Sequence, residues 1–67
     1  MKCQLCDQEA TWIVVHAHDP EAKSPYLRCV TCTPYAGNHT LIRTSSPRAP
    51  MYIARIVANR LQERLDP

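Results

Sequence analysis

The 67-residue sequence has no phenylalanine, one tryptophan and one glycine, so large aromatic side chains and flexible backbone positions are scarce. No apolar run approaches the roughly 18 residues that a membrane span requires. A chain this short buries only about 60% of its unfolded surface, so a hydrophobic core alone supplies little stability. The single glycine argues against a Gly-rich phosphate loop, and no Ser/His/Asp set or carboxylate pair is recognisable. We therefore expect no enzymatic activity.

Four cysteines form two C-x-x-C pairs, Cys3/Cys6 and Cys29/Cys32, and residues 7–28 separate the pairs. Each C-x-x-C turn, here called a knuckle, directs two sulfurs toward one point. Two knuckles complete a tetrahedral shell of four sulfurs around Zn²⁺. Structural zinc contributes roughly 10–16 kcal/mol of apparent binding free energy in zinc-finger peptides. We predict one structural zinc ion bound by all four cysteines, with folding of the N-terminal half dependent on it.

Other uses of the four cysteines stay open at this point. Two disulfides would need an oxidising compartment, yet Met1 is followed by Cys3 without the apolar stretch of a secretory signal. We therefore expect a cytoplasmic protein with reduced thiols. A thiol redox pair normally lies at a helix start in a βαβ unit, which this sequence does not predict. An iron–sulfur cluster also uses four cysteines and stays an alternative to zinc.

Three segments rich in β-branched or aromatic residues, 11–16, 26–28 and 39–44, predict short strands between turn-rich connections. The order of knuckle, hairpin, knuckle and strand is typical of a zinc ribbon. We therefore expect a small zinc-stabilised α+β fold with two or three short antiparallel strands and a C-terminal amphipathic helix. The alternative is a treble clef, in which the second cysteine pair opens a helix. Pro34 and Gly37 argue against a long helix there.

A Ser/Pro-rich linker, residues 45–49, separates the predicted ribbon (1–44) from the C-terminal helix (50–67) within one compact domain. Ser46 followed by Pro47 is typical of an N-cap and a first helical residue. Apolar residues then repeat every four positions, which predicts an amphipathic helix; they are Ile53, Val57, Leu61 and Leu65. This stripe either packs on the ribbon or stays partly free for a partner groove or for a second copy in a homodimer.

The net charge of +2 is unevenly distributed along the chain. Residues 1–38 carry three basic and four acidic side chains, whereas residues 39–67 carry five basic and two acidic ones. An anionic partner should therefore meet the C-terminal half first. The five arginines of that half are candidates for phosphate contacts: Arg43, Arg48, Arg55, Arg60 and Arg64.

His16 and His18 are two residues apart on the first predicted strand, so their side chains should share a face. With the thiolate shell complete, we interpret them and His39 as ordinary polar residues of strands. Aromatic side chains can also serve as stacking platforms for bases, but such sites interleave several aromatics with Lys or Arg. We place Trp12 in the core, over the knuckles.

The segment from Cys3-x-x-Cys6 through Ala10-Thr11 to Leu27-x-Cys29-x-x-Cys32 resembles the N-terminal zinc module of the protein arginine kinase activator family. The resemblance covers about the first half of the chain. Beyond the cysteine pairs, it rests on the Ala-Thr placement and on the separation of the pairs. It implies that the cysteines bind zinc and that the module serves protein–protein regulation. The paired-helix interaction motif of that family has no match in residues 33–67, so the kinase partner is not carried over.

We therefore expect a small regulatory adaptor without enzymatic activity or membrane association. It would dock on a protein partner through residues of the C-terminal helix: Ile53, Val57, Leu61, Arg60 and Arg64. The alternative is a transcription-associated zinc ribbon that binds nucleic acid through the five C-terminal arginines.

Overall fold

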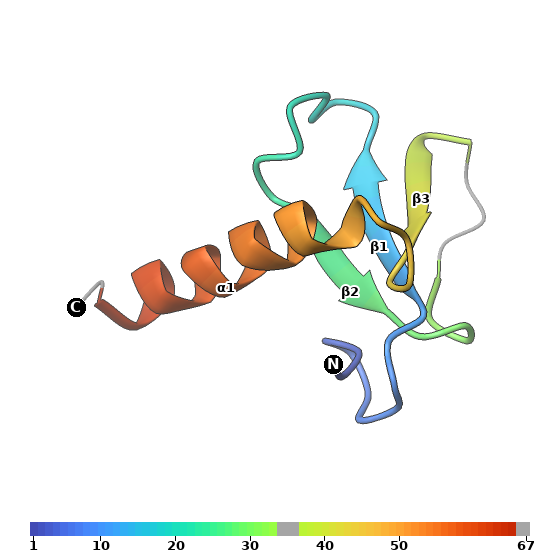
Figure 1. Cartoon of the computed structure of the whole chain (residues 1–67), viewed down its shortest axis with the longest axis horizontal. Helices are drawn as coiled ribbons and strands as arrows, with labels where there is room; N and C mark the ends of the chain where they lie inside the picture. The colour runs from blue at the N-terminus through green and yellow to red at the C-terminus, as the bar shows by residue number, and fades with distance from the viewer. Residues whose placement is uncertain (34–36, 66–67) are drawn as a thin grey trace.

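A computed structural model of the chain describes residues 1–33 and 37–65, with helix side chains described through residue 62. The elements are β1 (Trp12–His16), β2 (Tyr26–Arg28), β3 (His39–Arg43) and α1 (Ala49–Leu65). The strands form one antiparallel sheet in the order β2-β1-β3, and α1 crosses one face of it (Figure 1). The predicted small α+β fold, a ribbon followed by a helix, is confirmed. The Pro34 turn and the side chains of Arg64 and Leu65 lie outside the described residues.

The sheet buries the face that α1 covers. Ile13 of β1 pairs with Leu27 of β2 on one side and with Ile42 of β3 on the other. Cross-strand partners point to the same face of a sheet, so this apolar row faces the helix as a unit. All three side chains are buried in the core, and Val15, two residues further along β1, joins them. The sheet therefore supplies one wall of the core.

The helix supplies the other wall through Ala49, Tyr52 and Ile56, which are buried in the same cluster. Their spacing of three and four residues places them on one face of α1. Of the predicted stripe, Ile53 packs against the core, whereas Val57 is 43% exposed and Leu61 is 55% exposed. The helix is thus rotated so that Tyr52 and Ile56, at the margin of the predicted stripe, contact the sheet.

Polar contacts fix both the start and the rotation of α1. The Ser46 hydroxyl accepts a hydrogen bond from the backbone N–H of Arg48 at 3.2 Å, as an N-cap residue does. On the flank of the helix, the Arg55 guanidinium donates to the backbone carbonyls of Glu21 and Ala22. These contacts attach the β1–β2 connection to the side of α1, so Arg55 has a structural role.

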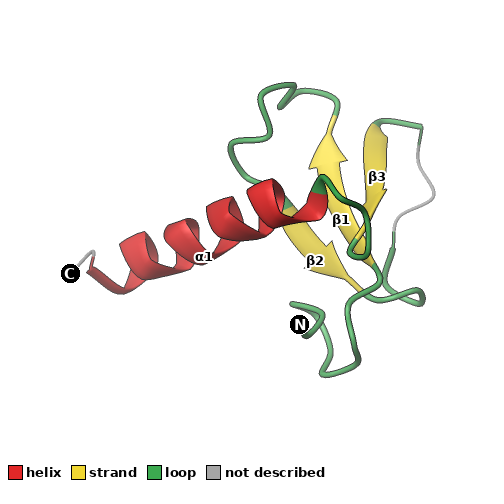
Figure 2. Ribbon diagram, viewed as in Figure 1, coloured by secondary structure: helices red, strands yellow, loops and turns green. Residues whose placement is uncertain are grey.

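The C-terminal part of α1 extends beyond the β2 edge of the sheet (Figure 2). Within the described residues, no helix is both long enough and apolar enough to cross a membrane.

Candidate metal centre

The first knuckle is a tight turn closed by its own backbone. The N–H of Cys3 donates to the carbonyl of Gln8 at 2.8 Å, which folds residues 3–8 back on themselves. Inside the turn, the N–H of Leu5 donates to the Sγ of Cys3 at 3.5 Å. An N–H group directed at a sulfur stabilises the negative charge of a thiolate. The local backbone thus prepares Cys3 as an anionic ligand.

The second knuckle follows β2 directly, because Cys29 is the residue after the last one of that strand. The Thr33 hydroxyl donates to the carbonyl of Cys29 at 2.6 Å and closes the turn. Cys29 is buried and Cys32 is partly exposed, and the same alternation holds for Cys3 and Cys6. Each knuckle therefore contributes one inner and one outer sulfur.

Gln4 connects the two knuckles. Its backbone N–H donates to the carbonyl of Leu27 at 3.2 Å, and its side-chain Oε1 accepts the N–H of Leu27 at 2.8 Å. Leu27 is two residues before Cys29, so these bonds fix the first knuckle beside the second. This role of Gln4 could not be predicted, because an exposed glutamine in a turn has no distinctive sequence pattern.

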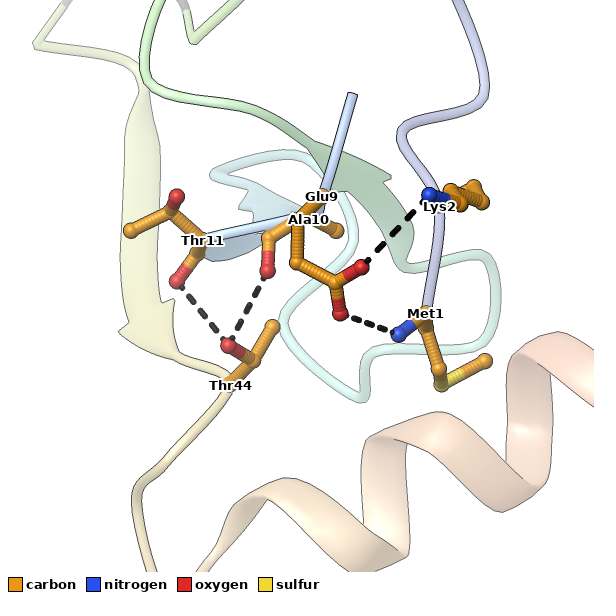
Figure 3. A network of polar contacts seen from close by, with 6 residues as sticks. All are labelled: Met1, Lys2, Glu9, Ala10, Thr11 and Thr44. Atoms are coloured by element: carbon orange, nitrogen blue, oxygen red, sulfur yellow. Dashed lines mark hydrogen bonds and ion pairs between the residues drawn. The ribbon is translucent and has the colours of Figure 1, made fainter. Parts of the chain in front are cut away.

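A second set of contacts holds the far side of the first knuckle, as Figure 3 shows. The Glu9 carboxylate accepts a hydrogen bond from the N-terminal ammonium of Met1 at 2.6 Å, and it lies 3.9 Å from the Lys2 ammonium. The Thr44 hydroxyl, just after β3, donates to the carbonyls of Ala10 and Thr11 at 3.2 and 3.4 Å. The segment that leads from the first knuckle into β1 is therefore tied to the end of β3.

The four sulfurs of Cys3, Cys6, Cys29 and Cys32 converge. All four lie within 4.8 Å of one another, and none forms a disulfide. The Cys6 Sγ is 3.4 Å from the Cys29 Sγ and 3.8 Å from the Cys32 Sγ. A tetrahedral ion with metal–sulfur distances of about 2.3 Å requires sulfur–sulfur distances of about 3.8 Å. The described residues thus form a four-sulfur site of the size that one metal ion needs, as the spacing predicted.

The crowded thiols differ in acidity. Burial raises the pKa of Cys3, but hydrogen bonds from the backbone, first from Leu5, outweigh burial and lower that pKa to about 6. The side chains of Cys29 and Cys6 raise the pKa of Cys32 to about 12. A bound cation favours the thiolate form of all four residues, so metal binding releases protons from this site. Four thiolates also fill a tetrahedral shell and leave no position for a water or a substrate.

The predicted nucleic-acid arginines have different neighbours. Arg43 lies over the Trp12 ring, with its guanidinium carbon 4.9 Å from the ring centroid. Arg48 donates to the Tyr52 hydroxyl at 3.1 Å, whereas Arg55 is engaged by the β1–β2 connection. Arg60 lines a groove of about 470 Å³ between α1 and the start of β2. These four side chains therefore do not present one common surface, and the Arg64 side chain is outside the described part.

Trp12 lies on the sheet face opposite the helix, although the sequence placed it in the core. The inner row is Leu27–Ile13–Ile42, so Trp12, one residue before Ile13, points the other way. It is half-buried and contacts Arg43. The first four residues of β1 are all apolar, so the sequence pattern does not indicate whether residues 12 and 14 or residues 13 and 15 face the core.

The three histidines gather at the end of the sheet farthest from the cysteines. His16 is the last residue of β1 and pairs with His39 of β3, with ring centroids 4.4 Å apart. The His18 ring, just beyond the strand, lies 4.9 Å from that of His16. The Tyr26 hydroxyl lies 2.7 Å from the Nε2 of His16. The predicted proximity of His16 and His18 is present, and β3 adds His39 to it.

The His16 environment predicts a pH-dependent stability. Burial lowers the pKa of His16 below its ordinary value of 6.5, and positive charge on His39 and His18 lowers it further. The folded state therefore binds fewer protons than the unfolded state, so stability is fully present above pH 6.5 and falls as the pH drops through 6.5 toward the folded pKa. We expect the melting temperature to fall as the pH drops below about 6.5, and His16→Gln to reduce that slope.

Thermal unfolding in a pH series measures this slope, with metal content checked at each pH. His18→Gln is the matched control, because His18 is exposed and only a secondary cause of the His16 shift. An identical slope for the parent protein and His16→Gln would contradict the prediction.

The chain matches no family model, no curated protein and no solved structure. The likeness to the protein arginine kinase activator module therefore rests on the cysteine spacing and the Ala10-Thr11 placement alone. The converging cysteines support a metal-binding knuckle pair without deciding a family.

Proposed function

We propose that this protein is a small zinc-binding adaptor without enzymatic activity, which docks on a protein partner through α1. Zinc is supported by the ligand set, because four thiolates at tetrahedral spacing suit zinc and are typical of its structural sites. The converging thiolates also suit iron, which is the alternative metal. A closed shell supports a structural role for the metal, and hence a binding function carried by another surface of the chain.

The outer face of α1 carries this proposal. It consists of uncharged residues spaced so that they share one side of the helix: Pro50, Met51, Ala54, Val57, Ala58 and Leu61. All six are exposed, and Met51 and Leu61 are each more than half exposed. A contiguous apolar face on a helix that already buries its other side is typical of a protein interaction site.

The shape and charge of α1 favour a helix-in-groove interaction. Its C-terminal part extends beyond the sheet, so a groove can approach it without contacting the ribbon (Figure 1). Such complexes use anchor residues at spacings of three, four and seven along one helix. Val57 and Leu61 are four residues apart. Toward the start of the helix, Ala54 and Met51 continue the same face at steps of three residues. Arg60 lies on the flank of α1 beside the start of β2, where its charge can add selectivity for an acidic partner.

The experiment compares proteins retained by the immobilised, zinc-loaded chain with those retained by two variants. Val57→Asp places a charge in the centre of the apolar face and is expected to lose the partner at least tenfold, because a buried unpaired charge is strongly unfavourable. Val57 is exposed, so helix content and bound zinc should not change.

Gln62→Asp is the matched control, since it adds the same charge at an exposed polar position of the same helix. Sedimentation analysis of the chain alone identifies the case in which the partner is a second copy. Equal retention by the parent protein and Val57→Asp would refute the docking proposal, as would retention lost equally in both variants.

A further inference from the structure

The face of the sheet opposite α1 combines aromatic and basic side chains. Trp12 is the centre of its first row, paired with Arg28 on one side and Arg43 on the other. Tyr26 and Leu41 flank Val14 in the second row. Because partners across strands share a face, these side chains lie on the side away from the core. None of the three strands contains Asp or Glu, so the charge of this outer sheet face is positive.

Two arginine–aromatic pairs lie on the outer sheet face. The guanidinium carbon of Arg28 is 4.1 Å from the centroid of Tyr26, and that of Arg43 is 4.9 Å from the centroid of Trp12. Both aromatic rings are half-buried, while Arg43 is exposed. A base can stack on an aromatic ring or on a guanidinium plane, and the same arginine can contact the adjoining phosphate. The two pairs therefore offer two adjacent stacking positions.

A groove beside the first row extends this site. It has a volume of about 330 Å³, within the range of about 300–1,000 Å³ that small-molecule sites have. Trp12, Arg43 and Arg48 line it together with the hydroxyl-bearing Ser45 and Ser46. A ring to stack on, two cations and hydroxyl donors are the groups that recognise a nucleotide with an unpaired base.

We infer that the outer sheet face binds single-stranded nucleic acid, with Trp12 and Tyr26 stacking bases and Arg28 and Arg43 contacting phosphates. A duplex fits this face less well, because paired bases are stacked on one another and cannot reach the rings. The apolar outer face of α1 is on a different element and lacks charge, so the two surfaces suit different partners. This inference does not depend on the proposed docking of α1, and the experiment below does not test that docking.

Binding is measured with zinc-loaded protein and a labelled single-stranded DNA of mixed sequence, about 12 nucleotides long, and with the corresponding duplex. Two phosphate contacts on a single strand predict an affinity loss of about sevenfold between about 50 and 200 mM salt. Trp12 is the only tryptophan, so quenching of intrinsic fluorescence reports stacking at this face directly. We expect quenching by the single strand and at least about fivefold weaker binding by Trp12→Leu.

Arg43→Glu and Lys23→Glu form the matched pair, because both are exposed basic residues and the charge change is identical. We expect Arg43→Glu to weaken binding at least tenfold and Lys23→Glu, in the β1–β2 connection, to change it less than threefold. Circular dichroism and zinc content verify that each variant is folded, and quenching in the parent protein tests the site without any substitution. Absent quenching, a preference for the duplex, or equal losses in both variants would overturn the inference.

Discussion

Replacing Cys29 by serine is expected to remove the bound metal and to unfold the ribbon. Cys29 is buried, and its sulfur is 3.4 Å from that of Cys6, so it is one of the two inner ligands. A water molecule cannot take the place of this sulfur without disturbing the packing around it. Loss of the metal leaves the knuckles held by a few hydrogen bonds and by a sheet of only three short strands. Structural zinc supplies roughly 10–16 kcal/mol in small peptides, which equals or exceeds the whole stability of a typical domain, about 5–15 kcal/mol.

The measurement is metal content by elemental analysis together with circular dichroism, before and after a strong chelator. The parent protein should contain one metal ion per chain and should lose its strand signal on chelation. Acidification should also release the metal, because protons compete for the four thiolates.

Val30→Ser is the control for the Cys29 substitution. Val30 lies in the same knuckle and is 64% exposed, so its replacement should leave the metal content unchanged. A folded Cys29→Ser protein that resists chelation would exclude a structural metal. A parent protein whose cysteines are titrated as free thiols at neutral pH, with no metal bound, would exclude it as well.

The four-sulfur site could be predicted because each part of it is local in the sequence. A C-x-x-C knuckle brings its own two sulfurs together, and a hairpin with strands at 12–16 and 26–28 is enough to bring the knuckles side by side. The third strand and the helix also followed from residue composition and periodicity: β3 ends one residue before the predicted strand end, and α1 begins one residue before the predicted helix start.

The rotation of α1 could not be predicted, because apolar residues occupy more than half of its circumference. Val57 and Leu61 match a repeat of four as well as Tyr52 and Ile56 do. What decides between them is the angle at which the helix crosses the sheet, and this depends on contacts distant in sequence. One of these is the Arg55 side chain on the carbonyls of Glu21 and Ala22.

The position of Trp12 was missed for a similar reason. Residues 12–15 are all apolar, so alternation does not identify the buried face of β1. The pairing of Ile13 with Leu27 and Ile42 decides which alternate residues of β1 face the core. That pairing depends on where the knuckles place β2. Because Arg28 directly precedes Cys29, the second knuckle also positions one end of the outer sheet face. The proposed nucleic-acid site should therefore require bound metal.

Truncation of Ile56 tests which face of α1 stabilises the fold. Ile56 is 2% exposed and lies in the core, so Ile56→Ala is expected to cost about 2–5 kcal/mol of unfolding free energy. In a domain of this size that loss lowers the melting temperature by about 10 °C or more. Val57→Ala, one residue along and 43% exposed, should change the free energy of unfolding by less than about 0.5 kcal/mol.

Thermal and urea unfolding of the metal-loaded variants measure both values. Metal content should stay at one ion per chain in both variants, because the knuckles are held by Gln4 and β2, and α1 donates no ligand. A larger loss for Val57→Ala than for Ile56→Ala would mean that the predicted stripe faces the sheet after all. In that case the apolar face offered to a partner would be the one that carries Tyr52 and Ile56, and the docking experiment would have to place its charge there.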